Sequence, residues 1–312
     1  MYQAETKLSV ITGAFGFTGS YIARNLIAVG ERVCTLTNHP RDNAGIEAAP
    51  LDFGNPDQLA RSMAGATVLY NTYWVRFAHG NVDHAEAVEN SRRLIRAAEE
   101  ARVERIVHVS ITNPSLASPL PYFKGKAEVE QIIQSSKLSY AILRPAVVFG
   151  REDILINNIA WLLRRFSIFA IPGKGDYKLQ PIFVEDLAEL AVKAGHEKQN
   201  MVLDAVGPET YAYARLVQLI RGVVGSRSWI VHFSPRTVVL ASKLLGALVN
   251  DVILTPDEVK GLMADLLISK DPALGKTSLR AWLEANVTTI GTTYSSELAR
   301  HYRRKKASQQ IN

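Results

Sequence analysis

The sequence predicts an α/β protein with a doubly wound parallel sheet and a smaller, mostly helical C-terminal lobe. From residue 8 to about residue 143, short apolar segments alternate with segments of helical periodicity, and strands that alternate with helices form parallel sheets. After Arg144-Pro145 the alternation loosens and the remaining chain is mostly helical in pattern. A chain of 312 residues is long enough for such a core with an appended lobe.

The first half of the chain contains six expected strands and four expected helices. The N-cap Asn55 with Pro56 at the first helical position marks one helix start. The expected strands are 8–12, 32–37, 47–52, 67–71, 105–110 and 140–143, and the helices are 18–29, 55–63, 82–102 and 124–135. In the second half we expect helices over 157–166 and 185–193, a strand over 201–205, a core or interfacial helix within 238–254 and a helix start at Thr255-Pro256-Asp257-Glu258.

Composition restricts the compartment and the partners. Cys34 is the only cysteine, so no disulfide can form within the chain, and we expect a reducing, cytoplasmic location. No apolar run reaches the length of a membrane span, residues 1–12 do not resemble a secretion signal, and no nucleic-acid motif is evident. Part of the net charge of +6 lies in Arg303-Arg304-Lys305-Lys306, which we expect to be a solvated tail, with an acidic lipid or protein contact as the alternative. We expect a monomer or homodimer.

A glycine-rich turn follows the first strand. The sequence there is Thr-Gly13-Ala-Phe-Gly16-Phe-Thr-Gly19, directly before an amphipathic helix. Gly13 allows a tight turn off the strand, Gly16 allows backbone to approach a pyrophosphate, and Gly19 allows the helix to pack closely on the sheet. The helix N-terminus offers N–H groups to the phosphates. The turn therefore predicts a dinucleotide site.

A second motif, Y-x-x-x-K, stands at Tyr122 and Lys126 at the start of a helix. Residues four apart share a helix face, so the ammonium lies near the phenol and favours the phenolate. Such a tyrosine can exchange a proton with a carbonyl or alcohol oxygen while a nicotinamide exchanges hydride. The motif predicts acid–base catalysis by Tyr122.

With these two motifs the chain resembles the short-chain dehydrogenase/reductase superfamily, in its extended and atypical, epimerase-like and NmrA-like branches. The resemblance covers roughly residues 8–206 and includes Leu143-Arg-Pro-Ala-Val-Val-Phe-Gly150, Gly173-Lys-Gly175 and Ile182-Phe-Val-Glu-Asp186-Leu-Ala. It implies an NAD(P)-binding Rossmann domain over 1–150 and about 182–206, and a substrate lobe over about 151–181 and 207–312. It implies Thr112 as the catalytic hydroxyl, with Ser110 as the alternate. Only nine residues separate Thr112 from Tyr122, fewer than the extended family usually has, which indicates an atypical branch.

The resemblance also implies cofactor contacts at the strand ends. The second strand ends in Thr37-Asn38 without an acid, and Arg41 follows, which favours NADP over NAD, because an arginine can bind a 2′-phosphate. Asp52-Phe53 is expected at the adenine and Asn71-Thr72 at the nicotinamide ribose. The expected cofactor-binding residues are Gly13, Phe15, Gly16, Phe17, Gly19, Thr37, Asn38, Arg41, Asp52, Phe53, Asn71, Thr72, Ser110, Tyr122, Lys126, Pro145, Val147 and Val148.

The leading functional interpretation is an NAD(P)-dependent oxidoreductase acting on a small carbonyl, alcohol or enone substrate. A nucleotide-sugar epimerase or dehydratase is one alternative, and a nucleotide-binding redox sensor or assembly factor, NmrA-like or similar to the accessory subunit of respiratory complex I, is another. Five aromatic residues on the expected substrate side line a pocket or pack the lobe: Tyr73, Trp74, Phe77, Phe149 and Tyr177. His79, Asp83 and His84 lack a further well-spaced ligand, so we expect no metal.

Overall fold

The computed structural model describes residues 7–41, 45–78, 80 and 82–301, and the chain divides into two compact units. Unit 1 comprises Met1–Gly150, Gln180–Thr210 and Leu266–Ser278, and unit 2 comprises Arg151–Leu179, Tyr211–Asp265 and Leu279–Asn312. The segment Leu266–Ser278 thus returns from the C-terminal part of the chain to unit 1, whereas the sequence analysis assigns it to the C-terminal lobe.

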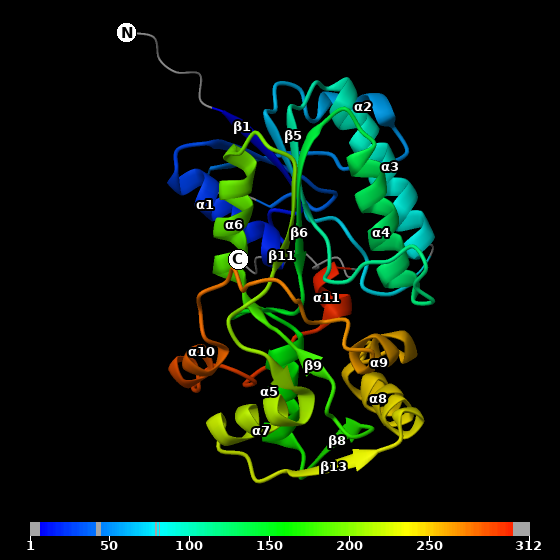
Figure 1. Ribbon diagram of the computed structural model, residues 1–312, viewed down its shortest axis with the longest axis vertical. Helices are drawn as coiled ribbons and strands as arrows, with labels where there is room; N and C mark the ends of the chain where they lie inside the picture. Colours follow the sequence, from blue (N-terminus) through cyan, green and yellow to red (C-terminus); the bar gives the residue numbers. More distant parts are fainter. Residues whose placement is uncertain (1–6, 42–44, 79, 81, 302–312) are drawn as a thin grey trace, which may run out of the picture. The chain divides into compact units, whose positions relative to one another are not determined.

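Unit 1 is built on a seven-stranded parallel sheet of order β11-β6-β5-β4-β1-β2-β3 (Figure 1). The order reverses between β1 and β4, and ligands of doubly wound sheets bind beyond the carboxyl ends of the strands at such a reversal. The strands are β1 Leu8–Thr12, β2 Arg32–Leu36, β3 Ile46–Ala49, β4 Val68–Asn71, β5 Arg105–Val109, β6 Ser139–Pro145 and β11 Met201–Ala205. A short parallel pair, β7 Val148–Phe149 and β10 Ile182–Phe183, completes the strands of this unit among the described residues.

Neighbouring strand residues point to opposite sides of the sheet. Because the strands are apolar on both sides, helices cover both faces. Ile11 belongs to the core under α1 Phe17–Ala28 and α6 Val184–His196, whereas Val10 belongs to the core under three other helices. These are α2 Pro56–Arg61, α3 His84–Glu100 and α4 Pro121–Gln134, which lie on the opposite side of the sheet in Figure 1. This confirms the predicted α/β class.

Unit 2 is smaller and mostly helical. Its helices are α5 Leu155–Arg165, α7 Tyr213–Val223, α8 Pro235–Val249, α9 Pro256–Met263, α10 Leu279–Ala285 and α11 Glu297–His301. Two short strand pairs join them: β8 Ile168–Pro172 with β13 Trp229–Phe233, parallel, and β9 Lys178–Leu179 with β12 Tyr211–Ala212, antiparallel. In the described part of the chain, no helix is long and apolar enough to cross a membrane.

Several element boundaries differ from the predicted ones for local reasons. β3 ends at Ala49, not at residue 52, because Pro50 cannot donate to the sheet ladder. α4 begins at Pro121, three residues early, since proline suits the first helical position. α8 ends at Val249 because Asn250 adopts the left-handed conformation, with φ of 53°. The alternation-poor strands β8 and β13 were not predicted.

Candidate nucleotide-binding site

The glycine turn between β1 and α1 has the geometry that phosphate binding requires. Gly13 has φ of +75°, and its N–H donates to the Leu36 carbonyl at the end of β2. A Cβ on Gly19 would lie 2.3 Å from the Gly13 carbonyl oxygen, and one on Gly16 would lie 3.1 Å from the same atom. Gly16 is the N-cap of α1, and no side chain caps this helix. The glycines therefore let the backbone of the turn fold tightly, and the uncapped first turn of α1 leaves N–H groups that fit a pyrophosphate.

The loop after β2 brings Arg41 to the glycine turn. The Arg41 guanidinium carbon lies 5.9 Å from the centroid of the Phe15 ring, and Arg41 is exposed. Thr37 stabilises the start of this loop, because its hydroxyl accepts a hydrogen bond from the His39 N–H at 3.0 Å. Residues 42–44 lie outside the described part of the chain. The described contacts place one cation beside the turn, where a dinucleotide carries its adenosine ribose.

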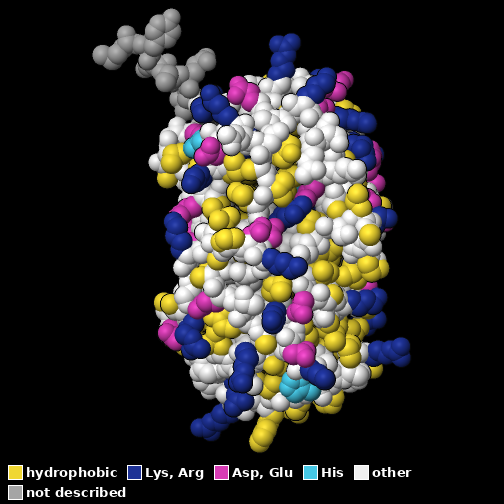
Figure 2. Space-filling model, viewed as in Figure 1, with side chains coloured by type: hydrophobic (Ala, Val, Ile, Leu, Met, Phe, Trp, Pro, Cys, Tyr) yellow, Lys and Arg dark blue, Asp and Glu magenta, His cyan; other side chains and the backbone are white. Residues whose placement is uncertain are grey.

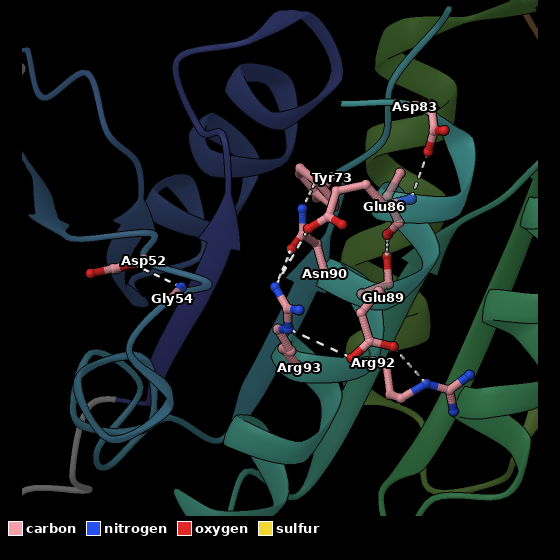
Figure 3. A network of polar contacts seen from close by, with 11 residues as sticks. Asp52, Gly54, Tyr73, Asp83, Glu86, Glu89, Asn90, Arg92 and Arg93 are labelled. Carbon is pink, nitrogen blue, oxygen red and sulfur yellow. Dashed lines mark hydrogen bonds and ion pairs between the residues drawn. The ribbon is translucent and has the colours of Figure 1, made fainter. Parts of the chain in front are cut away.

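Aromatic rings lie where the adenine is expected. The Phe53 and Tyr73 centroids are 4.9 Å apart, and the Asp52 carboxylate accepts from the Gly54 N–H at 2.9 Å, which fixes the turn after β3. Figure 3 shows the Tyr73 hydroxyl directed at α3, where it accepts from the Asn90 amide at 3.1 Å. The Tyr73 ring is thereby held against Phe53.

Charged residues on α3 support Asn90 in turn (Figure 3). Arg93 donates to the Asn90 amide oxygen at 3.2 Å and pairs with Glu86 and Glu89, at 3.5 and 3.6 Å. Asp83 caps the same helix by accepting from the Glu86 N–H at 2.8 Å. Burial raises the pKa of Tyr73, so its phenol stays protonated. This network positions the Tyr73 ring through Asn90.

The carboxyl ends of β1, β4 and β5 share a buried polar network. The Asn71 side-chain oxygen accepts from the Thr12 hydroxyl at 3.1 Å and from the Tyr73 N–H at 3.0 Å. The Asn71 amide nitrogen is 3.1 Å from His108 Nδ1, to which it donates. Asn71 and His108 are fully buried, and burial holds the pKa of His108 well below its usual value. The Asn71 side chain thus links the ends of β1, β4 and β5, and its expected contact with the nicotinamide ribose stays a prediction.

Lys126 of α4 is buried against the end of β5, with 3% of its surface exposed. Its Nζ donates to the Val109 carbonyl at 2.8 Å and lies 4.7 Å from the Trp74 ring centroid. The Tyr122 ring meets the same Trp74 edge-on at 5.9 Å, so Trp74 contacts both members of the Y-x-x-x-K pair. Desolvation lowers the pKa of Lys126 to about 7, although the nearby Glu130 carboxylate acts in the opposite direction and raises it. Tyr122 and Lys126 thus both contact Trp74. The Lys126 amino group is held by the Val109 carbonyl.

The alternate hydroxyl, Ser110, is bound to a carboxylate. Its Oγ donates to Glu130 Oε1 at 2.5 Å, and Arg144 pairs with the other Glu130 oxygen at 2.5 Å. Ser110 and Glu130 are both buried. A hydroxyl that donates to a carboxylate makes a strong hydrogen bond, so Ser110 is held by protein atoms at the end of β5.

The preferred hydroxyl, Thr112, holds the returning segment of unit 1. Its Oγ1 donates to the Leu266 carbonyl at 2.8 Å, and Thr112 is fully buried. The Asn113 amide donates to the carbonyls of Leu266 and Ile268, at 2.9 and 2.7 Å. Leu266 and Leu267, like Tyr122, pack against a small core of Ile111, Leu120 and Phe123. Both hydroxyl candidates therefore donate to protein acceptors.

As predicted from the sequence, the glycine turn follows β1, and Tyr122 and Lys126 lie in the helix after β5. The sequence did not predict the residues that pack against them. Gly125 was one available signal, because a Cβ there would lie 2.9 Å from Trp74, and glycine inside a helix indicates close packing. The Leu266 segment gave no such signal. Of the expected cofactor residues at β6 and β7, the Pro145 carbonyl accepts from the Thr112 N–H, and the Val147 carbonyl from the Ile182 N–H. Val148 is half-buried in β7.

The expectations for a metal site and for the basic tail both stay predictions. Among the described residues no group of three His, Cys, Asp or Glu side chains is arranged to hold a metal ion. His79 and the run Arg303-Arg304-Lys305-Lys306 lie outside the described residues.

Comparison with known proteins agrees with this geometry. Residues 13–153 match a family model described as NAD(P)H-binding. The chain is 28% identical over 289 residues to subunit 9 of the NADH dehydrogenase [ubiquinone] 1 alpha subcomplex of Mus musculus, covering 86% of this chain and 74% of that protein. It is 22% identical over 244 residues to the photosystem II assembly factor Ycf39 of Cyanidium caldarium, covering 76% of this chain and 78% of that protein.

Two solved structures share the fold. One is an NADPH-dependent quinone oxidoreductase of Escherichia coli complexed with NADPH, with a TM-score of 0.71, 20% identity, and coverage of 89% of this chain and 99% of that chain. The other is a nucleoside-diphosphate-sugar epimerase of Staphylococcus aureus, with a TM-score of 0.71, 15% identity, and coverage of 89% and 100%. At these identities the likeness concerns the fold alone.

Proposed function

We propose that this chain, an NAD(P)-binding Rossmann protein of the epimerase-like and NmrA-like fold, uses its nucleotide as a structural or sensing ligand and serves as an accessory or assembly protein. The observation that carries the proposal is the commitment of both strand-end hydroxyls to protein acceptors, Ser110 to Glu130 and Thr112 to the Leu266 carbonyl. Donors that are preorganised toward the oxygen on which charge develops accelerate hydride transfer to a carbonyl, and these two hydroxyls donate to protein atoms instead.

The partners named by two relatives agree with this proposal. Those relatives are a subunit of a respiratory NADH dehydrogenase and an assembly factor of photosystem II. For the present chain we infer a protein partner in addition to the nucleotide. The nucleotide would also stabilise the fold that the partner contacts, since a ligand that binds only the folded state stabilises it by about 2.7 kcal/mol at 100 times its Kd.

The nucleotide would be held by groups that the turn presents. The N–H groups at the start of α1 would bind the pyrophosphate, and the Phe53–Tyr73 pair would flank the adenine. Arg41 beside Phe15 would pair with a 2′-phosphate, and so we propose a preference for NADP(H) over NAD(H). A bound nicotinamide can supply hydride chemistry; the residues named here supply binding.

Hydride transfer to a small carbonyl or quinone is the second candidate, favoured by one observation. Tyr122 and the buried Lys126 lie on the same face of α4 against Trp74, and the pKa of Lys126 is lowered to about 7. A lysine that gains and loses a proton near neutral pH is suited to assist a tyrosine acid. Nucleotide-sugar epimerisation has no such separate support.

A Thr112→Val variant distinguishes the two candidates. In an accessory protein, loss of the hydroxyl removes one of the two side-chain hydrogen bonds that the Leu266 carbonyl accepts, the other coming from Asn113. This costs about 0.5–1.5 kcal/mol of unfolding free energy, while NADPH affinity is unchanged. In a reductase, loss of the hydroxyl costs turnover, by about 10²–10⁴-fold for a positioned catalytic group. Urea unfolding, calorimetric titration with NADPH and a screen of carbonyls and quinones measure these effects. A large loss of turnover with unchanged stability would reject the accessory role.

A further inference from the structure

Helix α8 of unit 2 leaves a row of leucines exposed. Leu240, Leu244 and Leu248 are 61, 66 and 82% exposed, whereas Val238 and Gly246 are the buried residues of this helix. Residues four apart share a helix face, so the three leucines form one stripe. Single exposed leucines are ordinary, but a contiguous apolar stripe marks an interaction surface.

Basic side chains border this stripe. Arg236 and Lys243 are exposed on α8, and at 3.6 residues per turn they fall along one edge of the leucine arc. The surrounding chain from Tyr211 to Asn250 contains five Arg or Lys residues and no Asp or Glu. Figure 2 shows hydrophobic side chains with dark blue Lys and Arg side chains over the lower right of the view, where Figure 1 draws α8 and α9. The face is thus apolar and purely cationic along α8.

The strand before α8 adds exposed aromatic rings. Trp229 and Phe233, at the two ends of β13, are 75 and 47% exposed, and residues at even spacing along a strand point to the same side. Tryptophan, leucine and basic residues together are typical of helices that lie in the plane of a membrane interface. The absence of a spanning helix among the described residues agrees with a contact at the surface.

We propose that α8, with Trp229, docks this chain on the surface of a membrane that contains anionic lipids. The leucine stripe enters the boundary between headgroups and acyl chains, and Arg236 and Lys243 meet the lipid phosphates. A second copy of the chain is a poorer occupant, because a two-fold contact brings each cationic face against its equivalent. The proposal goes beyond nucleotide binding and does not depend on it, since α8 belongs to unit 2 and the glycine turn to unit 1.

The test is sedimentation of the full chain with phosphatidylcholine vesicles, with and without phosphatidylglycerol. We expect binding only to the anionic vesicles, accompanied by a blue shift of tryptophan emission that a Trp229→Phe variant reduces. A triple variant, Leu240→Ser with Leu244→Ser and Leu248→Ser, should lower the partition coefficient by at least about tenfold through lost apolar burial. Arg236→Gln with Lys243→Gln should lower it by about 30-fold, at about fivefold per basic residue.

Matched controls separate this surface from other sources of binding. Leu116→Ser removes a leucine of unit 1 that is 49% exposed, and should leave vesicle binding unchanged. All variants should keep the unmodified thermal midpoint and NADPH affinity, because the altered residues are exposed. The proposal is overturned if the full chain ignores anionic vesicles, or if the α8 variants bind as the unmodified chain does. It is also overturned if only glutamine substitution of Arg303, Arg304, Lys305 and Lys306 abolishes binding, or if the leucines prove necessary for a dimer or a protein partner without vesicle binding.

Discussion

Arg41 is the residue that decides between the two nicotinamide nucleotides in our account. Its guanidinium lies beside Phe15 of the glycine turn, and the end of β2 carries no acid to bind ribose hydroxyls. We expect NADPH to bind more tightly than NADH, and Arg41→Ala to weaken NADPH by about 1.5–3 kcal/mol, the value of a charge-assisted hydrogen bond. NADH affinity should hardly change. Calorimetric titration measures both, and equal affinities in the unmodified protein would contradict the assignment.

Lys126 should make stability depend on pH. Its pKa is about 7 in the folded state because burial disfavours the charge, against 10.5 for an ordinary lysine. Between these values the unfolded chain binds the proton and the folded chain does not, so stability rises with pH, by at most ~1.4 kcal/mol per pH unit. Below about pH 7 both states are protonated, and this dependence disappears.

A Lys126→Met variant isolates that effect. It keeps the length and apolar stem of the side chain and removes the titrating group. We expect the rise in urea midpoint between about pH 7.5 and about pH 9.5 to be smaller in the variant than in the unmodified protein. The same slope in both proteins would show that Lys126 is charged throughout this range, held by Glu130.

At the scale of the elements, the end of β5 acts as an anchor for the chain that returns as Leu266–Ser278. Asn113 has φ of 53°, a left-handed conformation that costs about 1–2 kcal/mol in most residues, and its amide binds two carbonyls of the segment. Asn113→Gly relieves the backbone and removes both hydrogen bonds. We therefore expect faster proteolysis within 266–278 in this variant, detected by mass spectrometry.

The control for that prediction is Asn250→Gly, at another left-handed position, which caps α8 in unit 2. This change should leave cleavage of the 266–278 segment unaltered. If Asn113→Gly resists protease as the unmodified chain does, the two amide bonds do not hold the segment.

Local pattern predicted the elements better than it predicted their neighbours. The glycine turn, the Y-x-x-x-K helix start and the parallel sheet follow from spacing and alternation, because both are set by residues close in sequence. Thr112 illustrates the contacts that local pattern could not predict. Its hydroxyl suggested catalysis, yet its acceptor is the Leu266 carbonyl, which lies 154 residues away in the sequence. No local pattern near Leu266 indicates that contact, and the paired strands β8 and β13 are likewise far apart in the chain, with Ile168 opposite Trp229.

The whole molecule carries two separate candidate binding surfaces, one in each unit. Unit 1 presents a glycine turn, an uncapped helix and a nearby arginine for a dinucleotide, while its catalytic-type hydroxyls bind protein atoms. Unit 2 presents the leucine stripe of α8. These two surfaces support our proposal that the chain binds a nucleotide as a structural or sensing ligand and that α8 docks it on a membrane surface.

The most direct test of the central claim is a turnover measurement on the nucleotide-loaded protein. NADPH and the unmodified protein are mixed with quinones, aldehydes, ketones and enones, and nicotinamide absorbance is followed over hours. Calorimetry on the same sample verifies that NADPH binds, and a Gly16→Val variant, whose Cβ crowds the Gly13 carbonyl, provides the nucleotide-free control. We predict saturable binding that Gly16→Val abolishes, with no oxidation of NADPH above the rate without protein. Sustained turnover that Tyr122→Phe abolishes would contradict the account.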